Sequence, residues 1–271
     1  MNGPFPWGDP GSSFSDFLAL YRQSSPLSAA PLPVGLTLPA GPEAGWIPLP
    51  RGTTVLALCF EGGALVAGDR MATEGYQVAD RRIEKVFKSD DHSAIAIAGA
   101  AGPCIELARL FQVELEHYEK LEGAQLSLDG KANKLAQMVR ANLPLAMQGL
   151  IVVPLFAGFD FKREQGRIFK YDVAGGRYEE AEYHATGSGG KDARTTMKKL
   201  YRPGLSPDEA LAVALEALYD AAEEDVATAG PDLIRNIFPT VKVIDRQGLT
   251  DVADDRIRTV MTRVLEQQRR G

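Results

Sequence analysis

Cysteine, basic charge and long apolar runs are all scarce in this 271-residue sequence. Its two cysteines, Cys59 and Cys104, lie in apolar segments without CxxC or Cys/His spacing, which predicts buried thiols rather than a disulfide and indicates no metal and no cofactor. Lys and Arg number 30 against 36 Asp and Glu, and the resulting net charge of -6 argues against nucleic-acid binding. No apolar run approaches the roughly 18 residues of a membrane-spanning helix, so we expect a soluble protein without membrane contact.

Proline is concentrated at the start of the chain. Residues 1–52 hold 10 of the 17 prolines and only five charged side chains, a composition typical of extended, weakly packed chain. The first eight residues carry no Lys or Arg, so the segment does not resemble a secretory signal, and a cytoplasmic location is expected. We therefore predict that residues 1–52 are an appendage and that residues 53–271 form the folded domain.

From Thr53 onward the apolar residues alternate between strand and helix periods. The strands are predicted at 53–60, 64–70, 93–98, 150–160, 167–173, 177–185 and near 240–246. The helices are predicted at 104–118, about 131–147, 190–202, 206–226 and 254–268. The fourth helix opens on a capping-box signature, Ser206-Pro207-Asp208-Glu209. This order suggests an α+β fold in which antiparallel sheets pack together and pairs of helices cover their outer faces.

The junction Gly52-Thr53-Thr54 places a hydroxyl where the leader meets the first strand. A cut before Thr53 would expose its α-amine, whose unperturbed pKa of about 7.7–8.0 leaves a usable neutral fraction near pH 7. Nucleophile and base would then share one residue, as in the N-terminal threonine variant of Ser–His catalysis. By itself, the same tripeptide is also typical of simple entry into a strand.

The first two strands predict a neighbour for Thr53. A three-residue turn at 61–63 would pair Val55 with Asp69, which makes Asp69 a diagonal cross-strand neighbour of Thr53. A buried carboxylate at that place needs a cationic partner, and Lys85 is one candidate. The alternative is a turn-capping Asp69 and a surface Lys85.

Several motifs follow one another between residues 53 and 265. They are GTTV at the junction, GDR containing Asp69, Lys85 at equal further spacing, AGAAG, TGSGG at 186–190 and EDVATAGPD at 224–232. Their order and spacing resemble the β-type, catalytic subunits of the 20S proteasome, in particular the bacterial, actinomycete-like kind. The resemblance implies an N-terminal nucleophile (Ntn) hydrolase fold, a four-layer αββα sandwich, and a threonine peptidase.

The resemblance also implies catalytic roles. Thr53 would be the nucleophile after an autocatalytic cut between Gly52 and Thr53 removes residues 1–52, with Asp69 and Lys85 as its supporting ion pair. Either Lys85 or the α-amine of Thr53 would accept the hydroxyl proton. The backbone N–H of Gly99 would supply the oxyanion hole.

Two further residues, Ser188 and Asp225, resemble an auxiliary pair that holds the Thr53 amine and a water. Thr228 stands where the family commonly has Ser, and Ala229 where it has Gly, so a hydroxyl is retained but the water geometry differs. The TGSGG run lacks the lysine pattern of a phosphate-binding loop, which argues against nucleotide binding.

By the same resemblance, five residues would line the pocket for the side chain that precedes the cut: Ala72, Thr73, Ile83, Ile97 and Ala101. None of the five is charged, so we expect a chymotrypsin-like preference for apolar or aromatic side chains.

The implied partners are other β subunits in stacked heptameric rings, rings of α-type subunits, an ATPase unfoldase and the unfolded proteins degraded inside the chamber. Two other classes remain: a structural ring subunit without catalysis, and a stand-alone Ntn amidase or simpler ATP-dependent protease ring. The joint presence of Gly52, Thr53, Asp69 and Lys85 argues against the structural subunit, and the long leader disfavours the simpler ring.

Overall fold

The structure, a computed structural model, describes residues 52–74 and 77–268. The leader predicted at 1–52 lies outside the described residues, except for Gly52. The strands are β1 (Thr54–Phe60), β2 (Gly63–Gly68), β3 (Ala72–Glu74), β4 (Gln77–Asp80), β5 (Val86–Asp90), β6 (Ser93–Gly99), β7 (Val152–Asp160), β8 (Gln165–Tyr171), β9 (Arg177–Glu180), β10 (Tyr183–Gly187), β11 (Thr240–Asp245) and β12 (Gly248–Asp251). The helices are α2 (Ala101–Glu122), α3 (Leu128–Ala141), α4 (Leu143–Ala146), α5 (Gly190–Leu200), α6 (Pro207–Glu224) and α7 (Asp254–Gln268).

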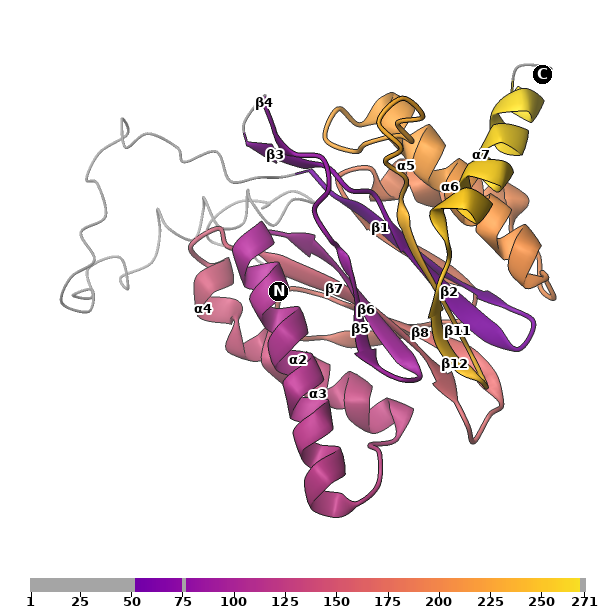
Figure 1. Ribbon diagram of the computed structural model, residues 1–271. Helices are drawn as coiled ribbons and strands as arrows, with labels where there is room; N and C mark the ends of the chain where they lie inside the picture. Colours follow the sequence, from indigo (N-terminus) through magenta and orange to yellow (C-terminus); the bar gives the residue numbers. More distant parts are fainter. Residues whose placement is uncertain (1–51, 75–76, 269–271) are drawn as a thin grey trace, which may run out of the picture. The chain divides into compact units, whose positions relative to one another are not determined.

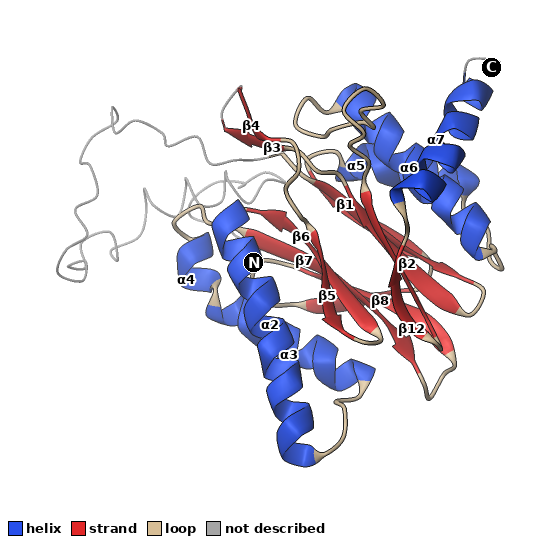
Figure 2. Cartoon of the chain, viewed as in Figure 1, coloured by secondary structure: helices blue, strands red, loops and turns tan. Residues whose placement is uncertain are grey.

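Two antiparallel sheets form the centre of the domain (Figure 1). In the described part of the chain, one sheet has the strand order β10-β1-β2-β11-β12 and the other β5-β6-β7-β8-β9, with β3 and β4 as a separate pair. Helices α2 and α3 cover one sheet, and α5, α6 and α7 cover the other (Figure 2). The predicted α+β class and the four-layer αββα arrangement are therefore confirmed.

Alternate residues of β1 show why the layers stack. Leu56 and Leu58 pack against the apolar sides of α5, α6 and α7, while Val55 and Ala57 pack against the second sheet. A strand with both faces buried reads as a continuous apolar run rather than an alternating one. β1 therefore runs through the middle of the core, and the residue just before it, Thr53, is only 7% exposed.

The predicted hairpin is present, but the predicted register of its two strands was wrong by one residue. Gly62 adopts φ +85°, which allows a two-residue turn, so Phe60 pairs with Gly63 and Val55 with Gly68. Asp69 consequently follows β2 and lies opposite Thr54 instead of Val55, with its N–H donating to the Thr54 carbonyl at 3.1 Å.

Other element boundaries also differ from the prediction. The single strand expected at 177–185 is two strands, because β9 pairs with β8 in one sheet and β10 pairs with β1 in the other. The helix expected at 131–147 begins at Leu128 behind the N-cap Ser127 and ends at Ala141, before the short α4. Four strands were not predicted: β3, β4, β5 and β12. The capping box at Ser206 and Glu209 is formed as expected.

None of the described helices combines the length and the apolarity that crossing a bilayer would require.

Candidate active site

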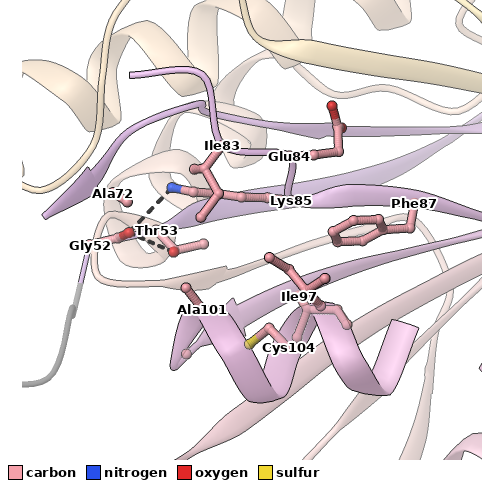
Figure 3. Close-up of a pocket in the computed structure, with 12 residues that line it drawn as sticks. Gly52, Thr53, Ala72, Ile83, Glu84, Lys85, Phe87, Ile97, Ala101 and Cys104 are labelled. Atoms are coloured by element: carbon pink, nitrogen blue, oxygen red, sulfur yellow. Dashed lines mark hydrogen bonds between the residues drawn. The ribbon is translucent and has the colours of Figure 1, made fainter. Parts of the chain in front are cut away.

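Thr53 lies at the entry to β1 with its side chain against the preceding peptide group. Its Oγ1 donates a hydrogen bond to the Gly52 carbonyl oxygen at 2.6 Å. The Lys85 Nζ donates to the same oxygen at 3.2 Å (Figure 3). The Gly52 carbonyl oxygen therefore accepts hydrogen bonds from both the Thr53 hydroxyl and the Lys85 ammonium.

Asp69 is the electrostatic partner of Lys85. The Lys85 Nζ lies 2.7 Å from Asp69 Oδ1, and the two side chains are 5% and 0% exposed. The backbone N–H of Thr54 donates to the same oxygen at 2.8 Å, while the N–H groups of Met71 and Ala229 donate to Oδ2 at 2.9 and 3.2 Å. Both oxygens of the carboxylate therefore accept hydrogen bonds, and neither is left unpaired in the core. The surface position considered for Lys85 is excluded.

Burial lowers the pKa of Lys85, against the opposing attraction of Asp69. Lysine is well suited to this kind of tuning, because its ammonium is a point charge whose protonated form is disfavoured away from water. Lys85 reaches this position from the start of β5, since its backbone carbonyl accepts the N–H of Ile97 at 3.0 Å. The adjacent strand β6 therefore fixes the backbone from which the ammonium extends.

Ser188, Asp225 and Thr228 form a second polar cluster on the nitrogen side of Thr53. The Thr53 N–H donates to Ser188 Oγ at 3.3 Å. The hydroxyls of Ser188 and Thr228 both donate to Asp225 Oδ2, at 2.5 and 2.6 Å. Asp225 is the C-cap of α6, so the end of that helix positions the carboxylate. The structure thus brings together the six polar residues that the sequence analysis gave catalytic or auxiliary roles.

Glycine at two positions allows these segments to approach closely. A Cβ at Gly52 would overlap the carbonyl oxygen of Ala227, and a Cβ at Gly189 would overlap the Thr54 hydroxyl. The glycine-rich TGSGG run therefore has a steric explanation in the approach of α5 to β1, without a phosphate ligand. The described residues also hold no cluster of three or more His, Cys, Asp or Glu side chains that could bind a metal ion.

A pocket opens beside Thr53 and Gly52 (Figure 3). Eight of the site residues named from the sequence line it: Gly52, Thr53, Ala72, Ile83, Lys85, Ile97, Gly99 and Ala101. Thr73 is buried in β3 and is not among the lining residues.

Sequence reasoning missed three apolar lining residues, Phe87, Cys104 and Ile105. Their signal was present in the spacing, because Phe87 is four residues beyond Ile83 in extended chain, and Cys104 and Ile105 are one helical turn beyond Ala101. Glu84 also lines the pocket, but its carboxylate points away from Thr53 and Ile97 (Figure 3). Burial raises the pKa of the Cys104 thiol to about 12, so the thiol is neutral at pH 7 and adds no charge to the pocket.

Comparison with known proteins shows which family the chain belongs to. A model of the proteasome subunit family matches residues 49–233. The chain belongs to the proteasome subunit family. A proteasome subunit beta from Acidimicrobium ferrooxidans is 61% identical over 212 residues, which are 78% of this chain and 78% of that protein.

Two further relatives extend over more of the chain. Proteasome subunit beta of Acidothermus cellulolyticus is 52% identical over 267 residues, covering 97% of this chain and 89% of the relative. Proteasome subunit beta of Streptomyces griseus is 54% identical over 263 residues, covering 95% and 91%. The resemblance to proteasome β subunits and the threonine protease class are thereby confirmed.

Proposed function

We propose that this proteasome-family chain is a self-processing threonine endopeptidase with Thr53 as its nucleophile. The observation that carries the proposal is the 2.6 Å contact between Thr53 Oγ1 and the Gly52 carbonyl oxygen, which Lys85 also contacts at 3.2 Å. A nucleophile beside the peptide bond and a cation on the carbonyl oxygen are the two elements that acyl transfer requires.

In the proposed self-cleavage, Thr53 Oγ attacks the Gly52 carbonyl carbon, and negative charge develops on the oxygen that Lys85 contacts. The C–N bond then breaks, the nitrogen takes up the hydroxyl proton, and an ester joins Gly52 to Thr53. Water hydrolyses the ester, which leaves a carboxylate on Gly52 and a free α-amine on Thr53. The Thr53 nitrogen is an amide until the C–N bond breaks, so it can act as a base only after that step.

In the mature enzyme, the Thr53 hydroxyl attacks the substrate carbonyl and transfers its proton to the α-amine or to Lys85. Ser188 and Asp225 hold the amine together, a role supported by the contact of Ser188 Oγ with Thr53 N and by the bond of Ser188 to Asp225. The N–H of Gly99 stabilises the oxyanion, a role supported by the place of Gly99 on the wall of the pocket that contains Thr53.

A Thr53→Ala variant tests this proposal. Produced with an α-type proteasome subunit, the wild-type protein is expected to hydrolyse fluorogenic peptides, and the variant to lose at least about 10³-fold of kcat/KM, because no other hydroxyl occupies its place. Thr53→Ser should retain part of the activity. Full activity of Thr53→Ala would exclude Thr53 as nucleophile, and an inactive wild-type particle would favour the structural ring subunit.

The pocket predicts substrate preference. Its inner walls are apolar, so we propose chymotrypsin-like cleavage after Leu, Phe or Tyr. A charged side chain would lose its hydration there, and of the two charged lining residues Lys85 is already paired with Asp69 and Glu84 points away (Figure 3). Peptides with Arg or Glu before the cut should therefore show kcat/KM at least about 10-fold lower. Comparison of matched fluorogenic peptides that differ only at this residue checks the prediction. Faster cleavage after Arg or Glu would contradict it.

We further propose that residues 1–52 are a propeptide and that the chain assembles into stacked heptameric β rings capped by α-type rings, in the cytoplasm. An ATPase unfoldase would feed unfolded proteins through the α ring into the chamber. The family membership and the beta-subunit names of its relatives support this assembly.

A further inference from the structure

We propose that Thr54, the residue after the nucleophile, is a positioning residue for the Thr53 amine. Its hydroxyl lies 2.6 Å from the hydroxyl of Thr228, 174 positions away in the sequence. Thr228 in turn contacts Asp225, which contacts Ser188 beside the Thr53 nitrogen. The inference rests on the proposed function of Thr53 and adds a residue to its support.

The direction of each hydrogen bond follows from the available protons. The one hydroxyl proton of Thr228 is donated to Asp225 Oδ2 at 2.6 Å, so Thr228 Oγ1 must accept from Thr54. Ser188 donates its proton to the same carboxylate oxygen at 2.5 Å, so its Oγ accepts from Thr53 N. Both branches of the network therefore end on Asp225, one from Thr54 and one from the nucleophilic residue.

The contact between the two threonines is buried. Thr54 is 0% exposed and Thr228 is 4% exposed, so solvent has little access to replace a lost donor. Gly189 packs against both hydroxyls, and a Cβ there would overlap Thr54 Oγ1 and come within 3.0 Å of Thr228 Oγ1. The pair is thus confined between β1, the start of α5 and the segment after α6.

Thr54 also contacts both Asp69 and the segment that follows α6. Its N–H donates to Asp69 Oδ1 at 2.8 Å, while the N–H of Ala229 donates to Asp69 Oδ2 at 3.2 Å. The backbone of Thr54 therefore contacts the carboxylate of the Lys85 pair, and its side chain contacts the Asp225 cluster. A shift of Thr54 would change the position of both groups relative to Thr53.

Loss of the Thr54 hydroxyl has a predicted electrostatic consequence. A hydrogen bond donated to Thr228 polarises its O–H and strengthens the bond to Asp225. Without that donor the carboxylate is less well satisfied, which stabilises the protonated form of the nearby Thr53 amine. A larger share of the amine would then be unable to accept the hydroxyl proton at a given pH.

The experiment compares Thr54→Val with Thr54→Ser in particles assembled with the α-type subunit. For Thr54→Val we expect about a 10-fold loss of kcat with little change in KM, and an acid limb of the kcat profile shifted to higher pH. Thr54→Ser should restore both. Thr228→Val removes the other hydroxyl of the contact, and combining it with Thr54→Val should add little further loss, because the two act as a unit.

Thr196→Val is the matched control, since the Thr196 hydroxyl is also buried and donates to a carboxylate, Asp220, at 2.5 Å. It should lower the melting temperature without moving the pH profile. If Thr54→Val has the kcat and pH profile of the wild-type protein, the proposal for Thr54 is overturned. The role of Thr53 as nucleophile is tested separately by Thr53→Ala. If Thr54→Val fails to assemble, Thr228→Val alone must show the shift, and its absence overturns the proposal equally.

Discussion

Replacing Lys85 by methionine is expected to lower kcat/KM for peptide hydrolysis by at least about 10³-fold and to stop release of the leader. Methionine fills similar space but supplies no charge to the Gly52 carbonyl oxygen, which Lys85 contacts at 3.2 Å, or to Asp69 at 2.7 Å. Peptidase assays and electrophoresis of the assembled particle measure the two effects. Normal processing and activity of Lys85→Met would remove Lys85 from the mechanism.

The same variant is expected to lose stability, because a buried carboxylate left without its partner costs about 3–5 kcal/mol. Lys131→Met is a matched control for this effect. Lys131 is also buried and lies 2.6 Å from Asp90, but it belongs to α3 and does not line the pocket. It should show a comparable loss of melting temperature with peptidase activity retained. Equal loss of activity in both variants would attribute the Lys85 effect to folding.

Gly52→Ala is expected to slow self-cleavage by about 100-fold. The added Cβ would overlap Ala227, so the residue 52 carbonyl must move away from Thr53 Oγ1 and Lys85. A displacement of about 1 Å from reacting geometry commonly costs a factor of about 10² in rate. Accumulation of the precursor, followed by mass spectrometry during assembly, measures the effect.

Gly102→Ala is the control for Gly52→Ala. Gly102 lies in α2, near the pocket, and a Cβ there meets nothing within 4 Å. Its processing rate should equal that of the wild-type protein. Equal rates for all three proteins would show that the close approach of Ala227 does not govern the cleavage geometry.

Much of the fold was predictable because its long elements have strong local signals. The capping box at Ser206 and the apolar repeat of α2 predict helices without reference to distant residues. Strands of three or four residues, such as β3 and β12, are too short to show a period and were missed. The register error at Asp69 arose because turn length depends on Gly62, whose positive φ closes the hairpin one residue earlier.

The candidate site was predictable in composition and less so in its contacts. Motif order brought Thr53, Asp69 and Lys85 together by resemblance. No local pattern in the sequence relates Thr54 to Thr228, because that contact depends on how α6 ends beside β1. The spacing of Phe87 and Cys104 is consistent with a place on the pocket wall. That place becomes evident only in the structure, where β5 and α2 flank the same pocket.

The most direct measurement is intact mass with N-terminal sequencing of the particle assembled with an α-type subunit, beside a Thr53→Ala control. A new terminus reading TTVLALCF, absent from the control, is the predicted result. Retention of residues 1–52 in a fully assembled wild-type particle would contradict it, and the catalytic role of Thr53 would then have to be withdrawn.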